Sequence, residues 1–334
     1  MRTVYFIIPN FDRSITGGTF YDSQVCKYLK KIHINIKTIV VNHDITSIQL
    51  FVKMSKIPSR SIIYMDGYLA NKAIHIIKKN KNISLLIHHP CSLEKSNNNL
   101  TEPKLYFHEK ISFSHAKSII TVSNYMRTVI KRYLNNKVKI NIVNPGVDSA
   151  FFDCMSNNNS NNILSIGNVI RRKGYLWLIE SLKNIDINWH LNIIGHYNKD
   201  DQYYNELISL IQKYQLQDKI SLLGNISNEN MFKYINNSKL FVLPTYYEGF
   251  GMSLLESSIA GLKVITTDLP VLREVLRNRE VDFIEVNNIN SLTIAIKNNL
   301  EKSFIANKKD NKRQYSWERA AANFSKVMYV NGKV

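Results

Sequence analysis

Short apolar runs recur along the whole chain, separated by longer segments in which apolar residues return every three or four positions. Each run is rich in Val, Ile and Leu and has the length of a strand. The segments "YDSQVCKYLKKI", "YLWLIESLKNI" and "YNELISLIQKYQL" instead have the period of a helix with one apolar face. Strands that alternate with helices are typical of parallel sheets joined by helical crossovers. The pattern therefore predicts an α/β protein.

The apolar runs fall into two groups of six, which predicts two sheets. The first group is "TVYFIIP", "INIKTIVV", "SIIYM", "ISLLIHH", "SIITVS" and "INIVNPG", and the second is "NILSIGN", "HLNIIGH", "ISLLGN", "KLFVLPT", "KVITTD" and "DFIEV". A chain of 334 residues also exceeds what one core usually holds. We expect two doubly wound, Rossmann-like domains at 1–150 and 151–315, with the polar tract "SNNNSNN" as a hinge loop between them.

The net charge of +18 is concentrated in the first half of the chain. Residues 1–150 hold 22 Lys and Arg against 8 Asp and Glu, whereas residues 151–334 hold 22 against 18. A basic surface attracts anionic lipid, nucleic acid or phosphorylated ligands, but a chain this rich in Lys, Asn and Ile can also reflect biased genomic base composition. Charge alone does not decide between these explanations.

Targeting and redox signals are weak. No apolar run approaches the roughly 18 to 20 residues of a membrane span, and the first apolar segment ends at Pro9, too early for a signal peptide. Cys26, Cys91 and Cys154 are widely spaced and suit neither a disulfide framework nor a structural zinc site. We therefore expect a cytoplasmic protein.

Residues that follow the strands are candidates for ligand binding, because open parallel sheets bind ligands beyond the carboxyl ends of their strands. Gly17 and Gly18 come after the first strand and before a helix, where backbone can approach a ligand, although many such pairs are only turns. Arg171, Arg172 and Lys173 come after the first strand of the second group. They suit a phosphate, or else form a solvated basic turn.

The stretch "YYEGFGMSLLE" places two carboxylates around a flexible turn and a helix start. Free N–H groups at the helix start can hold a diphosphate, and a carboxylate on either side can accept hydrogen bonds from hydroxyl groups. A diphosphate flanked by two hydroxyl-bearing rings is a nucleotide sugar, with Glu248 on the sugar and Glu256 on the ribose. The donor site would also include Gly249, Phe250, Gly251 and Met252. Alternatively, both carboxylates only stabilise the helix dipole.

At these residues the chain resembles the retaining glycosyltransferases of family 4, which have the two-domain GT-B fold. The resemblance covers nearly the whole chain, and its most specific part is the Glu-x7-Glu pattern "EGFGMSLLE". Other matches are the Gly-Gly loop, "LIHHPCSLE", "IITVSNYMRTVI", "VNPGVD" and "YSWERAAANF". The resemblance implies that residues 316–334 form a terminal helix and tail that pack back on the first domain.

The resemblance also implies roles for individual residues. Glu248 would orient the donor sugar and His88 would lie near the reacting sugar, while His89 and Glu94 would face the acceptor. In one departure from the family's Gly-Arg-x4-Lys-Gly motif, "GNVIRRKG" has Asn168 where the family has arginine. Lys173 matches the motif, and Arg172 is the candidate to supply the missing guanidinium.

The implied reaction moves a hexose from a nucleoside-diphosphate sugar to a hydroxyl of a glycan or glycolipid acceptor, with retention of the anomeric configuration. Such chemistry serves the assembly of lipopolysaccharide, O-antigen or another surface polysaccharide. Neither cofactor nor metal is expected, which agrees with the lack of an Asp-x-Asp sequence. The basic first half, with segments such as "ANKAIHIIKKNKN" and "YMRTVIKRYLNNKVK", would dock peripherally on an anionic membrane.

Three other functions are compatible with parts of the sequence. An epimerase or hydrolase of nucleotide sugars on the same fold would need further acid and base residues. A polyanion-binding protein would use the basic half, but no aromatic and basic recognition motif is present and no nucleic-acid partner is expected. A non-catalytic partner is disfavoured because both glutamates and the basic pair remain.

Overall fold

The chain folds into two compact α/β units. The computed structural model describes residues 3–11, 16–80, 82–94, 102–135, 137–157, 159–302 and 312–331. Met1–Gly146 and Arg313–Val334 form the first unit, and Val147–Lys312 form the second. The chain thus passes from one unit to the other at 146/147 and returns at 312/313.

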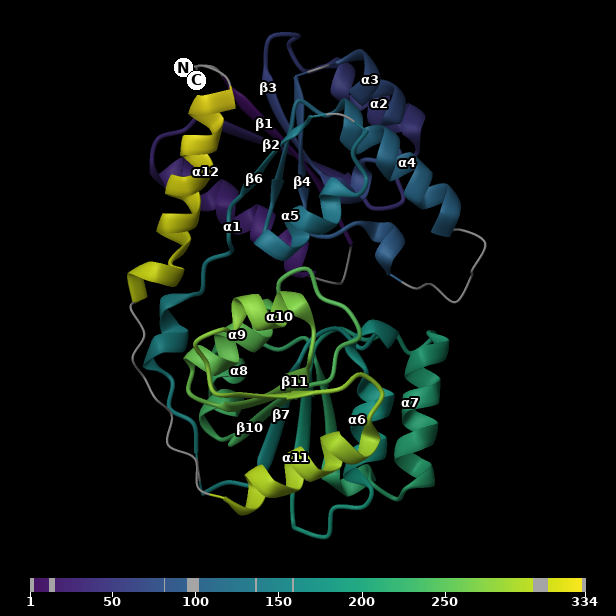
Figure 1. Ribbon diagram of the computed structural model, residues 1–334, viewed down its shortest axis with the longest axis vertical. Coiled ribbons are helices and arrows are strands. Elements are labelled where there is room, and N and C mark those ends of the chain that lie inside the picture. The colour runs from purple at the N-terminus through teal and green to yellow at the C-terminus, as the bar shows by residue number, and fades with distance from the viewer. Residues whose placement is uncertain are drawn as a thin grey trace. The chain divides into compact units, whose positions relative to one another are not determined.

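The first unit is built on a six-stranded parallel sheet in the order β2-β1-β3-β4-β5-β6 (Figure 1). Its strands are β1 (Val4–Asn10), β2 (Ile36–Asn42), β3 (Ile62–Asp66), β4 (Ile83–Ile87), β5 (Ser118–Thr121) and β6 (Lys139–Ile142). Its helices are α1 (Gly17–Lys31), α2 (Ser47–Ser55), α3 (Ile74–Lys79), α4 (Glu102–His115), α5 (Asn124–Lys131) and α12 (Trp317–Asn331). The order reverses between β1 and β3, so ligands are expected beyond these two strands.

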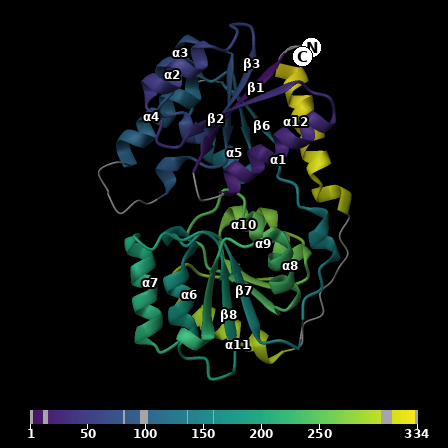
Figure 2. The ribbon, with the colours of Figure 1, turned by 180° about the vertical axis from the view of Figure 1, so that it is seen from behind.

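The second unit has its own six-stranded parallel sheet, in the order β12-β11-β10-β7-β8-β9. Its strands are β7 (Asn162–Ile166), β8 (His190–Ile194), β9 (Ile220–Gly224), β10 (Leu240–Leu243), β11 (Lys263–Thr267) and β12 (Val281–Ile284). Its helices are α6 (Tyr175–Leu182), α7 (Gln202–Lys213), α8 (Asn228–Asn236), α9 (Met252–Ile259), α10 (Pro270–Val275) and α11 (Ile289–Glu301). Figure 2 shows α6 and α7 side by side next to the sheet.

The predicted α/β class and its two parallel sheets are confirmed, because each of the twelve apolar runs forms a strand. Parallel strands are covered on both faces, so their apolar runs are continuous instead of alternating. All five residues of β3 and all five of β4 are buried accordingly. Helices α1, α6 and α7 form on the three segments of helical period, and each buries its apolar face.

The Asn-rich tract does not lie between the two units, contrary to expectation. It belongs to the second unit, where the Asn157 N–H donates to Ser238 O at 3.0 Å and the Ser160 hydroxyl donates to Asn237 O at 2.8 Å. These bonds tie the tract to the residues that follow α8 and lead it into β7. Polar composition indicated a loop, but it did not show that the loop's polar groups bond within one domain.

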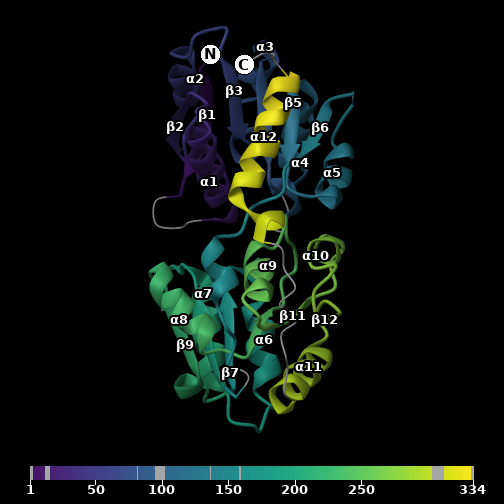
Figure 3. The same cartoon turned by 90° about the vertical axis from the view of Figure 1, so that its left-hand side faces the viewer.

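The carboxyl-terminal helix α12 belongs to the first unit and lies against α1 (Figure 3). Its Trp317 is buried, with ring centroids 5.9 Å from those of both Phe20 and Tyr21. Gly146 makes this approach feasible, since an added Cβ would lie 2.5 Å from the Trp317 backbone nitrogen.

Among the helices of the described ranges, none has the length and apolar character needed to cross a bilayer.

Candidate active site

In the second unit the predicted donor residues meet where the strand order reverses. Counted from β7, the sheet runs 3-2-1-4-5-6, and the reversal lies between β7 and β10. The loop after β7 carries Arg172 and Lys173, and the loop after β10 carries Glu248. Two hydrogen bonds join these loops, from the Tyr246 N–H and the Thr245 hydroxyl to the carbonyl oxygen of Arg172. Neighbouring strands of one sheet thus bring residues 75 positions apart into contact.

Glu248 is a buried carboxylate held between two cations. Its Oε1 lies 2.7 Å from Lys173 Nζ and 3.3 Å from Arg172 Nη1, and the same guanidinium donates to Tyr247 O at 2.7 Å. Burial acts to raise the pKa of Glu248, but Lys173 and Arg172 outweigh it and hold the pKa below its usual range. The carboxylate therefore stays charged at neutral pH and orients both cations.

Helices α6 and α9 both begin at this edge of the sheet, and both have a glycine at the N-cap. Gly174 has φ +70° and Gly251 has φ +88°, a left-handed conformation that favours glycine. Neither helix start receives a side-chain cap hydrogen bond. The first N–H groups of α9, at Met252, therefore remain suited to an anion, next to the buried Gly249 and Phe250.

Glu256 lies one turn into α9 and has a different environment from Glu248. Among the described residues no cation forms an ion pair with it, and burial, with a smaller contribution from Asp148, raises its pKa to about 7. Near neutral pH this carboxyl group can either accept or donate a hydrogen bond. The two glutamates of the motif are thus electrostatically distinct, one held ionised and one easily protonated.

Arg171 and Asn168 belong to the same loop after β7. They contact Glu206 and His196, respectively. Arg171 pairs with Glu206 at 2.6 Å and lies over the ring of Tyr203. Asn168 Oδ1 accepts from the His196 N–H at 3.3 Å and so links the loops that follow β7 and β8. In the described structure, Arg172 and Lys173 are the cations that contact Glu248.

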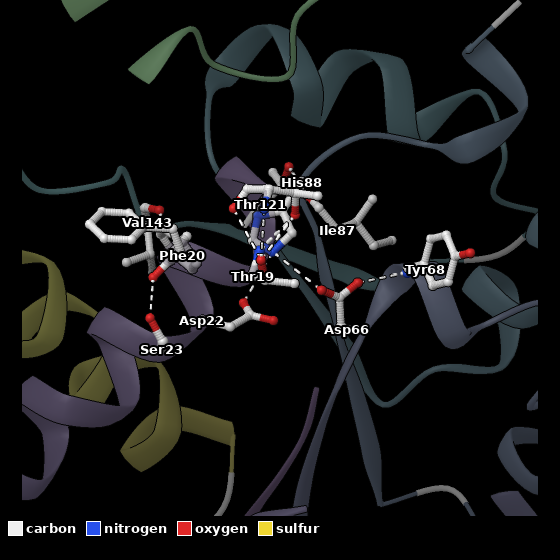
Figure 4. A network of polar contacts seen from close by, with 12 residues as sticks. Thr19, Phe20, Asp22, Ser23, Asp66, Tyr68, Ile87, His88, Thr121 and Val143 are labelled. Atoms are coloured by element: carbon white, nitrogen blue, oxygen red, sulfur yellow. Dashed lines mark hydrogen bonds and ion pairs between the residues drawn. The ribbon is translucent and has the colours of Figure 1, made fainter. Parts of the chain in front are cut away.

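In the first unit, His88 directly follows β4 and lies against two buried aspartates (Figure 4). His88 Nε2 is 3.0 Å from Asp22 Oδ1 of α1 and 3.8 Å from Asp66 Oδ2 at the end of β3. Burial raises the pKa of Asp22 to about 7, burial and Asp22 together raise that of Asp66 to about 8, and burial lowers that of His88. Sequence reasoning found His88 but missed both aspartates.

The Gly17–Gly18 pair begins α1 beside this histidine. Thr16 caps the helix and forms a capping box with Thr19. This box uses the Thr19 N–H and leaves those of Gly17 and Gly18 for other partners. Gly18 also makes room for the imidazole, because an added Cβ would lie 2.8 Å from His88 Cδ2.

His89 and Glu94, the predicted acceptor-side pair, lie together in the segment that follows β4, with His89 Nε2 2.8 Å from Glu94 Oε1. The same loop is held by a residue that the sequence did not reveal. Glu109 of α4 accepts hydrogen bonds from the N–H groups of Cys91 and Ser92 and from the Ser92 hydroxyl. A lone Glu in a helix gives no sequence signal for such a role.

Candidate metal ligands are few in the described ranges. Asp22, Asp66 and His88 form the group of carboxylate and imidazole atoms that lie within 4.8 Å of one another. Asp22 and Asp66 are almost fully buried, at 0% and 4% exposed. None of the three cysteines belongs to this group within the described ranges.

Comparison with known families gives one model that matches half of the chain. Residues 148–320 match the family described as "Glycosyl transferases group 1". This range covers the second unit except Val147, includes Arg172, Lys173, Glu248 and Glu256, and extends into α12.

Several curated and solved proteins are similar to the chain. The uncharacterized glycosyltransferase MJ1178 of Methanocaldococcus jannaschii is 26% identical over 356 residues, or 96% of this chain and 97% of that protein. The O-antigen chain mannosyltransferase RfbU of Salmonella typhimurium is 26% identical over 58% of this chain and 55% of its own length. A sucrose-phosphate synthase from Thermosynechococcus elongatus matches in structure with a TM-score of 0.84, 16% identity and 99% of both chains. Anabaena Alr3699/HepE, solved with UDP and glucose, has a TM-score of 0.76 and 14% identity over 99% of this chain and 100% of its own.

Proposed function

The chain belongs to the group 1 glycosyl transferases and has their GT-B fold, and on that premise we propose that it is a retaining hexosyltransferase of family 4. Its donor would be a nucleoside-diphosphate sugar and its acceptor a hydroxyl of a glycan or glycolipid. The observation that carries the proposal is the grouping of Lys173, Arg172 and Glu248 beside the uncapped start of α9. Cations and free N–H groups that converge on one point suit a diphosphate.

Stabilisation of the leaving group would supply most of the catalysis. The diphosphate gains negative charge as the glycosidic bond breaks, and preorganised donors act where that charge develops. Lys173 and Arg172 are held in place by Glu248 and by the Tyr247 carbonyl, so they need little reorganisation when an anion arrives. The N–H groups of Gly17 and Gly18 are further candidates in the first unit.

Glu248 is proposed to orient the sugar instead of attacking it. A carboxylate oxygen that already accepts from Lys173 at 2.7 Å is a weakened nucleophile, while its remaining lone pairs can accept from sugar hydroxyls. Glu256 would contact the ribose. Attack by the acceptor would then occur on the face that the leaving diphosphate occupies, which retains the anomeric configuration.

Surface polysaccharide assembly is the proposed process. RfbU is named for O-antigen chain synthesis, and a Staphylococcus aureus relative, CapM, is named for capsular polysaccharide synthesis and is 27% identical over 54% of this chain. A glycolipid acceptor, one of the two proposed classes, would lie at a membrane. The proposed location is therefore the cytoplasmic face of a membrane, with the net positive charge of residues 1–150 toward anionic lipid.

The burial of apolar residues in the helices of the first unit changes which helix is proposed to dock on the membrane. Helix α5, from the predicted segment "YMRTVIKRYLNNKVK", buries Met126, Val129 and Ile130 in the core, because its apolar face covers the sheet. Helix α3 likewise buries Ile77. Helix α2 buries Leu50 and Met54 but exposes other apolar residues, with Ile48 77%, Phe51 54% and Val52 51% exposed. The nearby Lys53 and Lys56 are exposed too.

Flotation with vesicles tests this part of the proposal. The wild type should float with vesicles rich in anionic lipid at low salt, and the Ile48→Ser, Phe51→Ser double variant should float at least several-fold less. Ile294→Ser is a matched control, because Ile294 is 58% exposed on the second unit. Equal flotation of all three proteins would exclude α2 as the docking surface.

A donor screen tests the function itself. Purified protein is offered UDP-, GDP- and ADP-sugars with a chelator present, and binding and hydrolysis are measured for the wild type and for Glu256→Ala. We expect selective binding of one nucleotide sugar, weakened by the substitution and unchanged by the chelator. Binding that requires an added divalent ion would contradict the metal-free reaction. Conversion of the sugar to an epimer without acceptor would indicate an isomerase.

A further inference from the structure

Within the described ranges, the two aspartates behind His88 are buried without a lysine or arginine partner. Asp22 and Asp66 are 0% and 4% exposed, and within the described part of the chain His88 alone forms an ion pair with either of them. Asp66 uses its Oδ1 to accept from the Tyr68 N–H at 2.7 Å, which leaves Oδ2 toward His88. Asp22 Oδ2 is buried and accepts from no N–H or hydroxyl group of the described residues, whereas the side chains of Asp22 and Asp66 hydrogen-bond each other. A carboxylate pair is rarely buried in this way without a function.

The packing of the ring decides which imidazole nitrogen meets the aspartates. A Cβ added to Gly18 would lie 2.8 Å from His88 Cδ2 and 3.4 Å from Nε2, so the edge formed by these two atoms lies on α1. Nε2 reaches Asp22 Oδ1 at 3.0 Å from the same edge. Nδ1 lies on the opposite edge of the ring and has no partner in the described ranges, and the side chain is 15% exposed.

The charges around the ring favour one protonation state. The groups that face His88 are Tyr21 and Asp22 of α1 and Asp66 of β3. Burial raises the pKa of the Tyr21 hydroxyl well above its usual range, and this hydroxyl donates to Val143 O. Burial lowers the pKa of His88, and the pKa of Asp66, about 8, exceeds that of Asp22, about 7. Asp22 Oδ1, 3.0 Å from His88 Nε2, is therefore placed to accept an N–H from this nitrogen, and burial favours the neutral form of the imidazole.

We propose that Asp22 and Asp66 are positioning residues that hold His88 as a neutral imidazole protonated on Nε2, so that Nδ1 accepts a hydrogen bond from a hydroxyl group of the bound sugar. The first part concerns the protein alone, while the sugar as hydroxyl donor rests on the proposed function. His88 then acts as an acceptor instead of an acid. Because the aspartates hold the ring against α1, a side chain at position 18 would clash with that edge of the ring.

Nuclear magnetic resonance of the histidine nitrogens tests the tautomer without any substrate. The full chain, labelled with ¹⁵N-histidine, is examined by long-range ¹H–¹⁵N correlation at pH 7.5, and His88 is assigned from the signals that His88→Gln removes. We expect Nε2 at the protonated position and Nδ1 at the unprotonated position. Asp22→Asn should retain this pattern because its carbonyl can accept the same N–H, and Asp22→Leu should not. Protonation on Nδ1 in the wild type would overturn the proposal.

Kinetics with the donor found in the screen test the consequence for catalysis. Asp22→Leu should lower kcat about 10- to 100-fold with little change in KM, and Asp22→Asn should recover most of that loss. His88→Asn places an acceptor near the former Nδ1 and should exceed His88→Gln in activity at least several-fold. In the wild type, kcat/KM should fall as the pH decreases into the range where His88 gains a proton, which burial places below the ordinary pKa of histidine. The reverse order of the two His88 variants would contradict the proposal.

Elemental analysis tests the alternative that Asp22, Asp66 and His88 bind a metal ion. One equivalent of a divalent ion in the purified wild type, lost in Asp22→Asn, would make the cluster a metal site and would overturn the proposal. If no donor is turned over but the spectrum shows the expected tautomer, the proposed function fails while the positioning of His88 stands.

Discussion

At the scale of single residues, the donor side depends on how Glu248 shares two cations. A buried carboxylate is costly to ionise unless it is paired, and Lys173 and Arg172 provide that pairing. A diphosphate that approaches the same cations gains charge-assisted hydrogen bonds, each worth roughly 1.5 to 3 kcal/mol. The glutamate therefore keeps the cations in position before the donor binds.

Replacement of Lys173 should lower kcat/KM for the donor more than replacement of its neighbour Arg171. Lys173→Gln loses one charge-assisted contact, so kcat/KM should fall about 10- to 150-fold. Arg171→Gln is the matched control, since Arg171 pairs with Glu206 and its side chain is 38% exposed. Its kcat/KM should stay within about threefold of the wild type. Equal losses in both variants would show a general effect of charge instead of a contact at Glu248.

Glu256 should make the stability of the second unit depend on pH. Its pKa is about 7 in the folded chain, above its ordinary value of 4.5, so the folded state binds the proton more tightly than the unfolded state. The free energy of unfolding should therefore decrease as the pH rises from 4.5 to 7, by up to about 3 kcal/mol.

Glu256→Gln cannot titrate, so it should gain stability relative to the wild type across that range and keep a constant advantage above pH 7. Urea denaturation followed by tryptophan fluorescence measures this, because Trp177 and Trp189 lie in the second unit. Glu301→Gln, at an exposed position, is the control and should show no such gain. A pH-independent difference for Glu256→Gln would contradict the burial of its carboxyl group.

The sequence revealed the residues of the second unit more completely than those of the first. Glu248 and Glu256 belong to one compact motif after β10 and Lys173 belongs to another after β7, so each position follows from local spacing. Asp22 lies in the second turn of a helix and Asp66 ends a strand, and only the fold brings both to His88. Such a cluster depends on strand order, which periodicity does not determine.

At the scale of elements, the two units start their key helices differently. Helix α1 is capped by Thr16, whereas α9 begins at Gly251 with no side-chain cap. A capped helix already satisfies part of its N–H groups, and an uncapped one leaves them for a ligand. This contrast makes α9 the stronger candidate for the diphosphate.

Gly251→Ala should disturb this helix start. The residue has φ +88°, and an added Cβ would lie 2.6 Å from Leu272 Cδ2, so both backbone strain and a steric clash result. Donor affinity should fall at least tenfold, with a loss of stability of roughly 1–3 kcal/mol.

Gly224→Ala is the matched control for this change. Gly224 has φ +66°, but its added Cβ would meet only Tyr197 Cε1, at 3.5 Å. It should lose stability through backbone strain and still bind the donor, as calorimetry would show. Equal loss of donor binding in both variants would attribute the effect of Gly251→Ala to stability alone.

At the scale of the whole molecule, the chain returns to its first unit through α12. Phe324 of this helix lies in the core, with ring centroids 5.6 Å from Phe6 of β1 and 5.1 Å from Tyr64 of β3. Phe324→Ala should therefore cost the first unit about 3–5 kcal/mol. Tyr329→Ala, at a residue 56% exposed on the same helix, should cost under about 1 kcal/mol. Thermal denaturation compares the two, and similar midpoints would exclude α12 as part of the first core.

The central claim is retention of configuration during sugar transfer, and time-resolved ¹H NMR of the anomeric proton tests it most directly. The wild type is given the α-linked nucleotide hexose selected by the donor screen, and the first sugar product is observed before mutarotation. We predict that the α anomer is formed first, as free hexose or as an α-glycoside of the acceptor. Formation of the β anomer first would contradict the account and would indicate an inverting enzyme.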